Sequence, residues 1–218
     1  MKKMEYVYKI LVVDDSADIA NSFKVYQDFL KDKGFKVEFS LASSKKELAE
    51  KLKRTHDILM VDYNLKNGFP SSDNYDGTDF IKEYREKNKI SKIIFCSSEF
   101  SYDEKNEKKC KLNLQSKEIF DLVNIYKVNC IVSKNNFNML IDSIAENLCD
   151  LDPITKLLID TKEKYSGETD NMIFTDSNGE EVGITRLLDE YLNDSSIGRE
   201  FKDQMMKTIV TLLLEYRY

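Results

Sequence analysis

Five side chains that could do chemistry each stand where a run of apolar residues ends: Asp14 and Asp15 after YKILVV, Asp62 at the end of DILMVD, Ser97 at the end of KIIFCS, and Lys134 at the end of CIVSK. Such runs are typical of strands that are covered on both faces of a parallel sheet. In open α/β sheets the ligand lies beyond the carboxyl ends of the strands, so we expect all five side chains to share one edge.

The residue types at this edge suggest a specific chemistry. Three carboxylates held together repel each other, and they stay ionised only where a cation balances them. An all-oxygen cluster suits a hard divalent ion, so Asp14, Asp15 and Asp62 predict a Mg²⁺ site. Lys134 adds a positive charge and Ser97 a hydroxyl donor. These are the groups needed to hold a phosphoryl group on a carboxylate, with the aspartate attacking phosphorus and the cations neutralising the developing charge.

The elements that must position these residues follow a repeating pattern. A further short strand is expected over 37–41, and helices are expected at these places: from Ile19 to Leu30, from Ser44 to about Arg54, around Phe80 to Tyr84, over about 117–126 and over about 136–148. Strand and helix therefore alternate five times. Right-handed crossovers then give a doubly wound α/β fold with a five-stranded parallel sheet.

These motifs resemble, in order, the signature of the receiver domain of two-component response regulators. The matching segments are VVDDS (12–16) for the acidic pair, DILMVDYNL (57–65) for the phosphoacceptor, Asp76-Gly77 for the end of the next loop, IIFCSSE (93–99) for the Ser/Thr strand and CIVSK (130–134) for the lysine strand. The resemblance covers about residues 8–150 and implies a flavodoxin-like (βα)5 receiver over residues 1–150.

The resemblance also assigns a role to each site residue. It implies that Asp62 is the phosphorylated residue. It implies that Asp15 and Asp62 bind Mg²⁺ directly, that Asp14 does so directly or through water, and that the main-chain carbonyl of Asn64 completes the protein ligands.

The resemblance further implies that Lys134 pairs with the phosphoryl oxygens and that Ser97 bonds to one of them. Asn64 and Glu99 stand at the two variable positions that tune attack by water and hence the lifetime of the phosphoryl group. The donor would be a sensor histidine kinase or a phosphotransfer protein. The chain would not be an enzyme in the usual sense, because it accepts a phosphoryl group on itself and slowly loses it.

Four features depart from the receiver pattern. Lys66 replaces the usual proline, and the loop that it begins is longer than usual. Asn135 stands where many members have a proline, so we expect no cis peptide there. Ile131 replaces the switch aromatic of many members. The 99–127 stretch is much longer than usual, so its output surface cannot be copied from relatives.

The last third of the chain differs in charge from the rest. Residues 151–218 hold 8 basic and 14 acidic residues, a net charge of −6, whereas the first 150 residues hold 25 of each. Because phosphate contacts require Lys and Arg, this sign argues against a nucleic-acid partner. The pattern predicts a small, mostly helical output or interaction domain with helices after Pro153 and over 185–192, and a short hairpin around Ser177-Asn178-Gly179.

A final helix is predicted to carry one apolar stripe, formed by Ile197, Phe201, Met205, Ile209, Leu212, Leu213 and Tyr216. A stripe of this kind needs burial. Packing within its own domain is the commoner outcome, and packing on the receiver or a homodimer through the C-terminal helices are the alternatives.

The remaining composition points to a cytoplasmic protein without a membrane span. Charged residues interrupt the apolar stretch near the start, so no signal peptide is expected, and no apolar run has the length of a membrane helix. The four cysteines show no metal-binding spacing and are expected to be reduced thiols. His56 is the single histidine, which we expect at the surface, away from the site.

We therefore interpret the sequence as a two-component response regulator whose downstream protein partner is unknown. Three alternatives stay open at this stage. One is a transcription regulator with an atypical DNA-binding tail, and another is a folded receiver that serves as a scaffold without being phosphorylated. The third is a metal-dependent phosphatase that uses Asp14 as its nucleophile on a similar sheet.

Overall fold

The computed structural model describes residues 6–69, 75–103, 105–106, 109–164 and 173–215. It divides into two compact units: unit 1 comprises residues 1–85 and 91–151, and unit 2 comprises residues 86–90 and 152–218. The short segment 86–90 therefore groups with the C-terminal unit, whereas the sequence-based division placed it in the first domain.

Unit 1 is built on a five-stranded parallel sheet with the strand order β2-β1-β3-β4-β5. Its strands are β1 (Val7–Val13), β2 (Lys36–Ala42), β3 (Ile58–Asp62), β4 (Lys92–Ser97) and β5 (Cys130–Ser133). This order and direction confirm the doubly wound, flavodoxin-like fold that the alternating pattern predicts.

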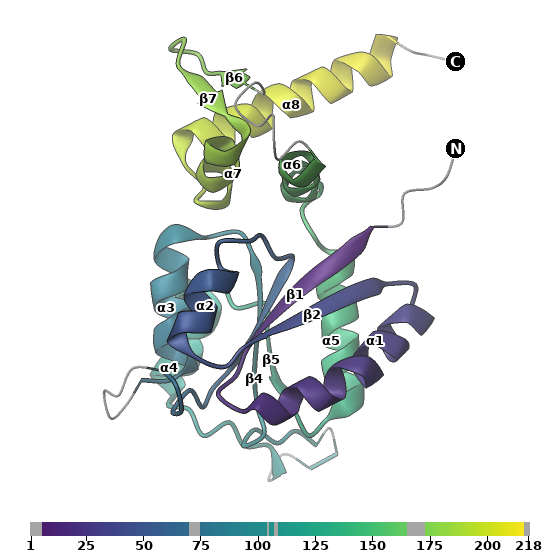
Figure 1. Cartoon of the computed structure of the whole chain (residues 1–218), viewed down its shortest axis with the longest axis vertical. Coiled ribbons are helices and arrows are strands. Elements are labelled where there is room, and N and C mark those ends of the chain that lie inside the picture. The colour runs from purple at the N-terminus through teal and green to yellow at the C-terminus, as the bar shows by residue number, and fades with distance from the viewer. Residues whose placement is uncertain (1–5, 70–74, 104, 107–108, 165–172, 216–218) are drawn as a thin grey trace. The chain divides into compact units, whose positions relative to one another are not determined.

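Helices cover both faces of the sheet (Figure 1). One face packs against α1 (Phe23–Asp32) and α5 (Phe137–Cys149), and its core includes Ile10 and Val12. The core on the other face includes Leu11 and Val13. The helices on this face are α2 (Lys45–Lys51), α3 (Gly77–Lys87), α4 (Ser116–Phe120) and the π-helix η3 (Asp121–Ile125). Alternate residues of β1 thus enter opposite cores, which is why the strand reads as one continuous apolar run.

Three local details differ from the helices expected from sequence. The first expected helix begins as a 3-10 helix, η1 (Ala17–Ser22), before α1. The second helix, α2, ends at Lys51 and not near Arg54. The helix expected over 117–126 is a short α-helix that continues as a π-helix. Among the described residues no peptide bond is cis.

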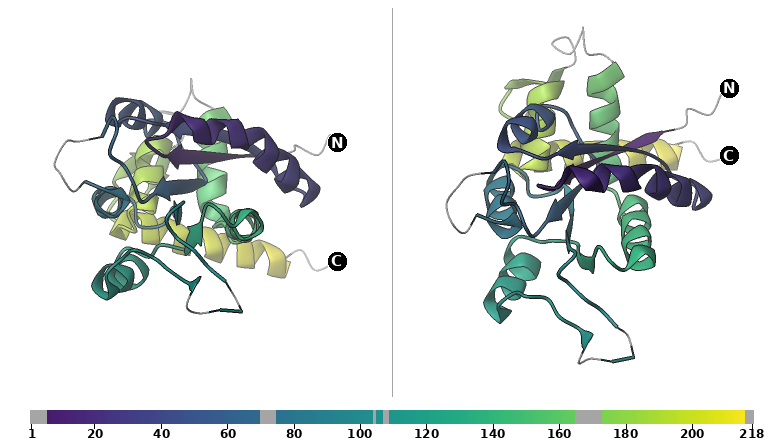
Figure 2. Two further views of the ribbon diagram at one scale, coloured as in Figure 1. Left: turned by 90° about the horizontal axis from the view of Figure 1, so that it is seen from below. Right: turned by 60° about the horizontal axis from the view of Figure 1, so that its bottom comes forward.

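The segment between β4 and α4 is a long excursion from the sheet (Figure 2). Main-chain hydrogen bonds in both directions between Ser101 and Lys111, 2.8 and 2.9 Å long, close its base. This excursion falls within residues 99–127.

The described residues of unit 2 form three helices and one antiparallel hairpin: α6 (Pro153–Lys164), β6 (Ile173–Thr175), β7 (Glu181–Gly183), α7 (Ile184–Leu192) and α8 (Ser196–Glu215). The hairpin and the helices are those that the sequence predicts. Residues 165–172, between α6 and β6, lie outside the described residues. No helix in the described part of the chain is both long enough and apolar enough to cross a membrane.

The stripe of α8 is buried only along its first half. Ile197, Phe201 and Met205 pack against the core of unit 2. Ile209 and Leu213 are 40% and 71% exposed, so packing of the stripe within its own unit does not extend to this half. The stripe's last residue lies outside the described residues.

Candidate functional site

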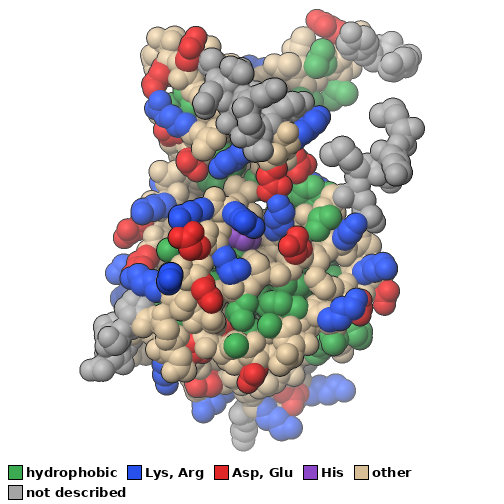
Figure 3. Space-filling model, viewed as in Figure 1, with side chains coloured by type: hydrophobic (Ala, Val, Ile, Leu, Met, Phe, Trp, Pro, Cys, Tyr) green, Lys and Arg blue, Asp and Glu red, His purple; other side chains and the backbone are tan. Residues whose placement is uncertain are grey.

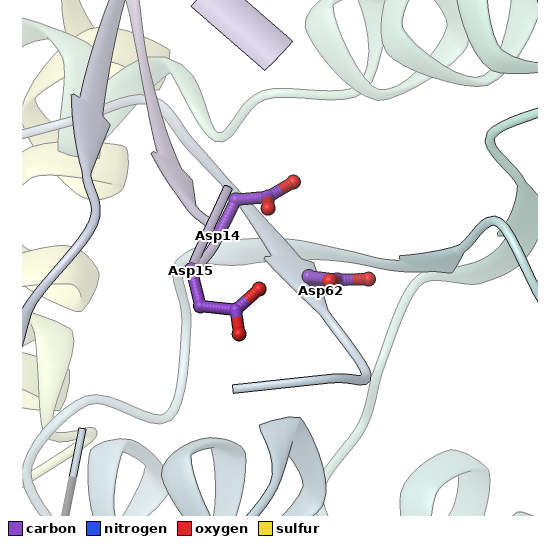
Figure 4. A group of neighbouring side chains, drawn as sticks. All are labelled: Asp14, Asp15 and Asp62. Atoms are coloured by element: carbon purple, nitrogen blue, oxygen red, sulfur yellow. The ribbon is translucent and has the colours of Figure 1, made fainter. Parts of the chain in front are cut away.

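Asp14, Asp15 and Asp62 meet at the carboxyl edge of the sheet. Each offers a carboxylate oxygen, and these three oxygens lie within 4.8 Å of one another. Because Val13 pairs with Val61 in neighbouring parallel strands, the residues that follow them, Asp14 and Asp62, leave the sheet side by side. Figure 4 shows the Asp14 and Asp15 side chains extending toward the side on which Asp62 lies. Within the described residues this is the one group of three acidic, Cys or His side chains arranged to hold a metal ion.

Lys134 completes this cluster from the end of β5. Its Nζ atom lies 2.6 Å from Oδ2 of Asp14 and 2.9 Å from Oδ1 of Asp62. The three side chains are only 14%, 2% and 7% exposed, respectively. Lys134 is separated from Asp14 by 120 residues, so this juxtaposition is created by the strand order and not by local sequence.

Burial dominates the electrostatics of the phosphoacceptor candidate. Burial raises the pKa of Asp62 to about 6, Lys134 opposes this shift, and the charges of Asp14 and Asp15 add to it. Burial alone would lower the pKa of Lys134, but the Cys96 thiol and the Asp62 and Asp14 carboxylates together raise it above its usual value. The ammonium is therefore held in its charged form at this edge.

The Asp15 carboxylate also accepts hydrogen bonds from the start of the long loop that follows β3. Its Oδ2 atom accepts the main-chain N–H groups of Lys66 and Asn67, both at 3.0 Å, and the Asn67 side-chain amide at 3.2 Å. Asp15 thus holds the chain that leaves β3 beside the cluster. The later part of this loop, including Pro70, lies outside the described residues.

Gly77, the first residue of α3, allows this helix to approach β3 at Asp62. Its N–H donates to the carbonyl of Tyr63 at 2.8 Å. A Cβ atom at this position would lie 2.1 Å from the main-chain oxygen of Asp62 and 2.9 Å from the ring of Phe95. A side chain here would therefore push α3 away from β3.

Ser97 is fully buried at the end of β4. Its carbonyl accepts the N–H of Lys134 at 2.9 Å, and its Oγ atom accepts the N–H of Glu99 at 3.1 Å. The hydroxyl therefore lies on the strand next to β3, where Cys96 pairs with Asp62. The structure places Ser97 at the predicted edge, one strand from the acidic cluster.

Asn64 and Glu99, which follow Asp62 and Ser97 by two residues, are joined to each other. The Asn64 side-chain amide donates to Oε1 of Glu99 at 3.0 Å. Oε2 of Glu99 accepts the amide of Asn113 at 3.1 Å. Asn113 belongs to the excursion after β4, and nothing in its sequence neighbourhood marks it, so sequence reasoning missed it.

The donor set of the cluster fits a hard divalent cation. Three carboxylates and one ammonium carry a formal charge of −2, and two of the carboxylates are almost fully buried. An excess of buried negative charge is unfavourable unless a cation compensates it. The oxygen-only donor set matches Mg²⁺ rather than a soft metal ion.

His56 lies apart from this cluster. It is partly exposed on the face that Figure 3 shows, where Lys and Arg side chains gather around it. Burial of the rest of the ring lowers its pKa to about 4, and the nearby positive charges of Lys9 and Lys51 contribute. His56 therefore stays neutral at physiological pH and has no part in the cluster.

Comparisons with known proteins concern the fold of unit 1. No sequence model of a known protein family matches the chain, and no curated protein sequence matches it. A response regulator receiver protein from Pseudomonas putida is 17% identical, with 65% of this chain and 98% of that chain covered and a TM-score of 0.46. A signal receiver domain from Clostridium thermocellum is 12% identical, covers 65% and 97% of the two chains and has a TM-score of 0.45.

The N-terminal domain of a response regulator/sensory box/GGDEF protein from Carboxydothermus hydrogenoformans is 20% identical, with 64% and 93% of the two chains covered and a TM-score of 0.41. These receiver structures leave the C-terminal part of this chain unmatched. A shared fold does not by itself define a function, so the function must be argued from the site.

Proposed function

We propose that this chain is a two-component response regulator in which Asp62 accepts a phosphoryl group. The observation that carries the proposal is the ammonium of Lys134 between two buried carboxylates, Asp14 and Asp62, at the carboxyl edge of the sheet. Buried charges are costly to maintain, and a cluster of this composition is suited to bind a phosphoryl group beside a cation.

The transfer step follows from the chemistry of the cluster. A carboxylate oxygen of Asp62 attacks phosphorus, and the bond between phosphorus and the donor's imidazole nitrogen breaks, with the electron pair remaining on that nitrogen. The donor would be a phosphorylated histidine of a sensor kinase or a phosphotransfer protein. Lys134 lies within 2.9 Å of Asp62 and would pair with the transferred oxygens. Ser97 would donate its hydroxyl to one of them.

Mg²⁺ is the cation that we propose for this site. Asp14, Asp15 and Asp62 would hold it, with the main-chain carbonyl of Asn64 as a further ligand. When bound, it would neutralise negative charge on the phosphoryl oxygens. The sequence and site therefore favour a Mg²⁺-dependent phosphoacceptor.

The phosphatase alternative, with Asp14 as nucleophile, is less compatible with the hydrogen bonds. Oδ2 of Asp14 contacts Lys134 and Oδ1 accepts the N–H of Ser16 at 2.9 Å, so both oxygens are engaged. We therefore propose that Asp62 accepts a phosphoryl group and that the chain does not turn over an external phosphoester.

Unit 2 is proposed as the output region, which acts through protein contacts. Phosphorylation converts the Asp62 carboxylate, with one negative charge, into an acyl phosphate with nearly two, so it adds about one negative charge to the edge of unit 1 and shifts a conformational equilibrium. The net charge of −6 in residues 151–218 favours a protein partner over DNA. If this region were instead a DNA-binding tail, the full chain would give a salt-dependent gel shift with DNA.

Labelling of the full chain with acetyl phosphate tests the proposal. We expect one phosphoryl group per chain by intact mass in the presence of Mg²⁺, none after chelation by EDTA, and none in Asp62→Asn. Asp142→Asn is the matched control, because Asp142 is exposed and pairs with Lys33 away from the site. Equal labelling of Asp62→Asn and the wild type would overturn the assignment, and a wild type that takes no label would favour the scaffold alternative.

A further inference from the structure

The Glu99 carboxylate is held by two amides that come from different parts of unit 1. Asn64 donates to one oxygen at 3.0 Å and Asn113 to the other at 3.1 Å. Asn64 follows the strand of Asp62, and Glu99 follows the neighbouring strand. Because Asp62 pairs with Cys96 in these two strands, the bridge between Asn64 and Glu99 spans the edge where the Asp62 carboxylate lies.

Asn113 fixes the outer end of this bridge. Glu99 is exposed, and a free glutamate side chain at such a position populates several rotamers. Its negative charge is also repelled by the acidic cluster. A hydrogen bond to each oxygen keeps the side chain in one orientation against this repulsion, since bonds to a charged group are the stronger ones.

The excursion after β4 is itself anchored at the point that positions Asn113. Main-chain bonds between Ser101 and Lys111 close its base, two residues before Asn113. The beginning of the excursion is also attached to β5, because the Ser133 hydroxyl donates to the carbonyl of Phe100 at 2.5 Å. The position of Asn113 therefore depends on the excursion and not on the strands that carry the acidic cluster.

We propose that Asn113 is a positioning residue that keeps the Asn64–Glu99 bridge closed at the rim of the Asp62 site and so slows hydrolysis of the phosphorylated form. This inference rests on the proposed function of Asp62. In hydrolysis a water oxygen forms a bond to phosphorus while the bond from phosphorus to the Asp62 oxygen breaks. Asp62 returns to a carboxylate, and both protons of the water leave on dihydrogen phosphate. A closed bridge limits the positions from which water reaches phosphorus.

The half-life of the phosphoryl group after removal of acetyl phosphate tests this proposal in the full chain. We expect Asn113→Ala to shorten the half-life by about threefold to tenfold. A small decrease in the free-energy barrier to hydrolysis, of the size that one weakened hydrogen bond gives, changes the rate by this factor. The initial rate of labelling should stay as in the wild type. Asn124→Ala is the matched control, because Asn124 is also exposed and its amide donates to the carbonyl of Phe120, outside the bridge.

A double-mutant comparison separates positioning from a general effect on the fold. If Asn113 acts through Glu99, Asn113→Ala should change the half-life no further in a Glu99→Ala background. Asn113→Gln, which keeps an amide donor, should restore part of the lifetime.

Each outcome bears on a defined claim. An unchanged half-life in a labelled Asn113→Ala chain would overturn the role of Asn113 alone. An equal effect of Asn113→Ala with and without Glu99 would do the same. A wild-type chain that takes no label would overturn the proposed function of Asp62 and this inference with it.

Discussion

Both units bury apolar cores, but they differ in the charged side chains that they bury. At the carboxyl edge of unit 1, the charged groups of Asp14, Asp62 and Lys134 come from three strands and are almost fully covered. In unit 2 the buried cluster is apolar, from Ile154 to Tyr191. Its buried acid, Asp176, accepts the N–H groups of Asn178 and Glu180 within its own turn.

Selection for stability alone does not explain the charged side chains that are buried at the edge of unit 1. Apolar burial stabilises unit 2 directly. Charges gathered from distant strands are costly, and apolar side chains of similar volume would often be at least as stable. The edge of unit 1 is therefore the part of the molecule whose composition calls for a function.

The largest expected effect is on the charge balance of this edge. Lys134→Ala should lower the free energy of unfolding of unit 1 by about 3 to 5 kcal/mol in EDTA, because it leaves buried carboxylates without their cation. Lys92→Ala is the matched control. The Lys92 side chain is 16% exposed, close to the 14% of Lys134, but its partner Asp150 is 81% exposed. The loss there should stay below about 1 kcal/mol.

The free energy of unfolding of both variants is measured by urea titration, and hydrogen exchange of the β1 and β3 amides reports the unfolding of unit 1. Equal losses for the two lysines would mean that the charges at the edge are no more strongly coupled than a surface ion pair. The contrast between the units would then lose its energetic basis.

A smaller effect is expected when alanine replaces either of two glycines, one in each unit, that lie close to the main chain of a neighbouring element. Gly77→Ala should destabilise unit 1 by about 3 kcal/mol and reduce labelling of Asp62, because the new Cβ atom would meet the Asp62 carbonyl oxygen at 2.1 Å. Gly198→Ala should destabilise unit 2 by about 1 to 2 kcal/mol, because its Cβ atom would meet the Glu190 carbonyl oxygen at 2.6 Å.

Labelling distinguishes the two variants. Gly198→Ala should take up the phosphoryl group as the wild type does, since it disturbs only the packing of α7 against α8. If both variants lost labelling to the same degree, the chemistry would not be confined to unit 1.

The smallest expected effect concerns pH and His56, a half-buried titratable group outside the cluster. Its pKa is lowered to about 4 in the folded chain, below the value of about 6.5 for an unfolded chain. The unfolded state therefore binds the proton more readily in this window, and stability falls as pH falls. Between pH 6.5 and 5 the wild type should lose about 1.5 kcal/mol that His56→Asn does not lose.

The comparison with His56→Asn is needed because Asp62 acts in the opposite direction. Its pKa is raised to about 6, so its protonation favours the folded state as pH falls. The difference between the two stability profiles, measured by urea unfolding at each pH, cancels this contribution. Parallel profiles would show that His56 titrates normally.

The sequence predicts the site residues because their positions follow from strand ends. Asp14, Asp62 and Lys134 each follow a continuous apolar run, and a parallel sheet brings such ends to one edge. The spacing of apolar residues also indicates most helices, although the 3-10 and π-helical segments do not differ in pattern from α-helix.

Other features have no comparable sequence signal. The bond between Asn113 and Glu99 depends on how the excursion after β4 folds back, and its polar residues show no periodicity. The grouping of 86–90 with unit 2 depends on Ile90 packing against a core formed more than 60 residues later. The exposed half of α8 continues the apolar period of its buried half, so periodicity alone cannot separate the two halves.

Asp62, and not another acidic residue of the cluster, is the proposed site of the phosphoryl group. Reduction of the acetyl phosphate-treated chain with borohydride converts a phosphorylated aspartate to homoserine, which peptide mass spectrometry locates. We predict homoserine at position 62 only, and only when Mg²⁺ was present. Homoserine at position 14 or 15, or a phosphorylated hydroxyl at Ser97 with position 62 unmodified, would contradict the account.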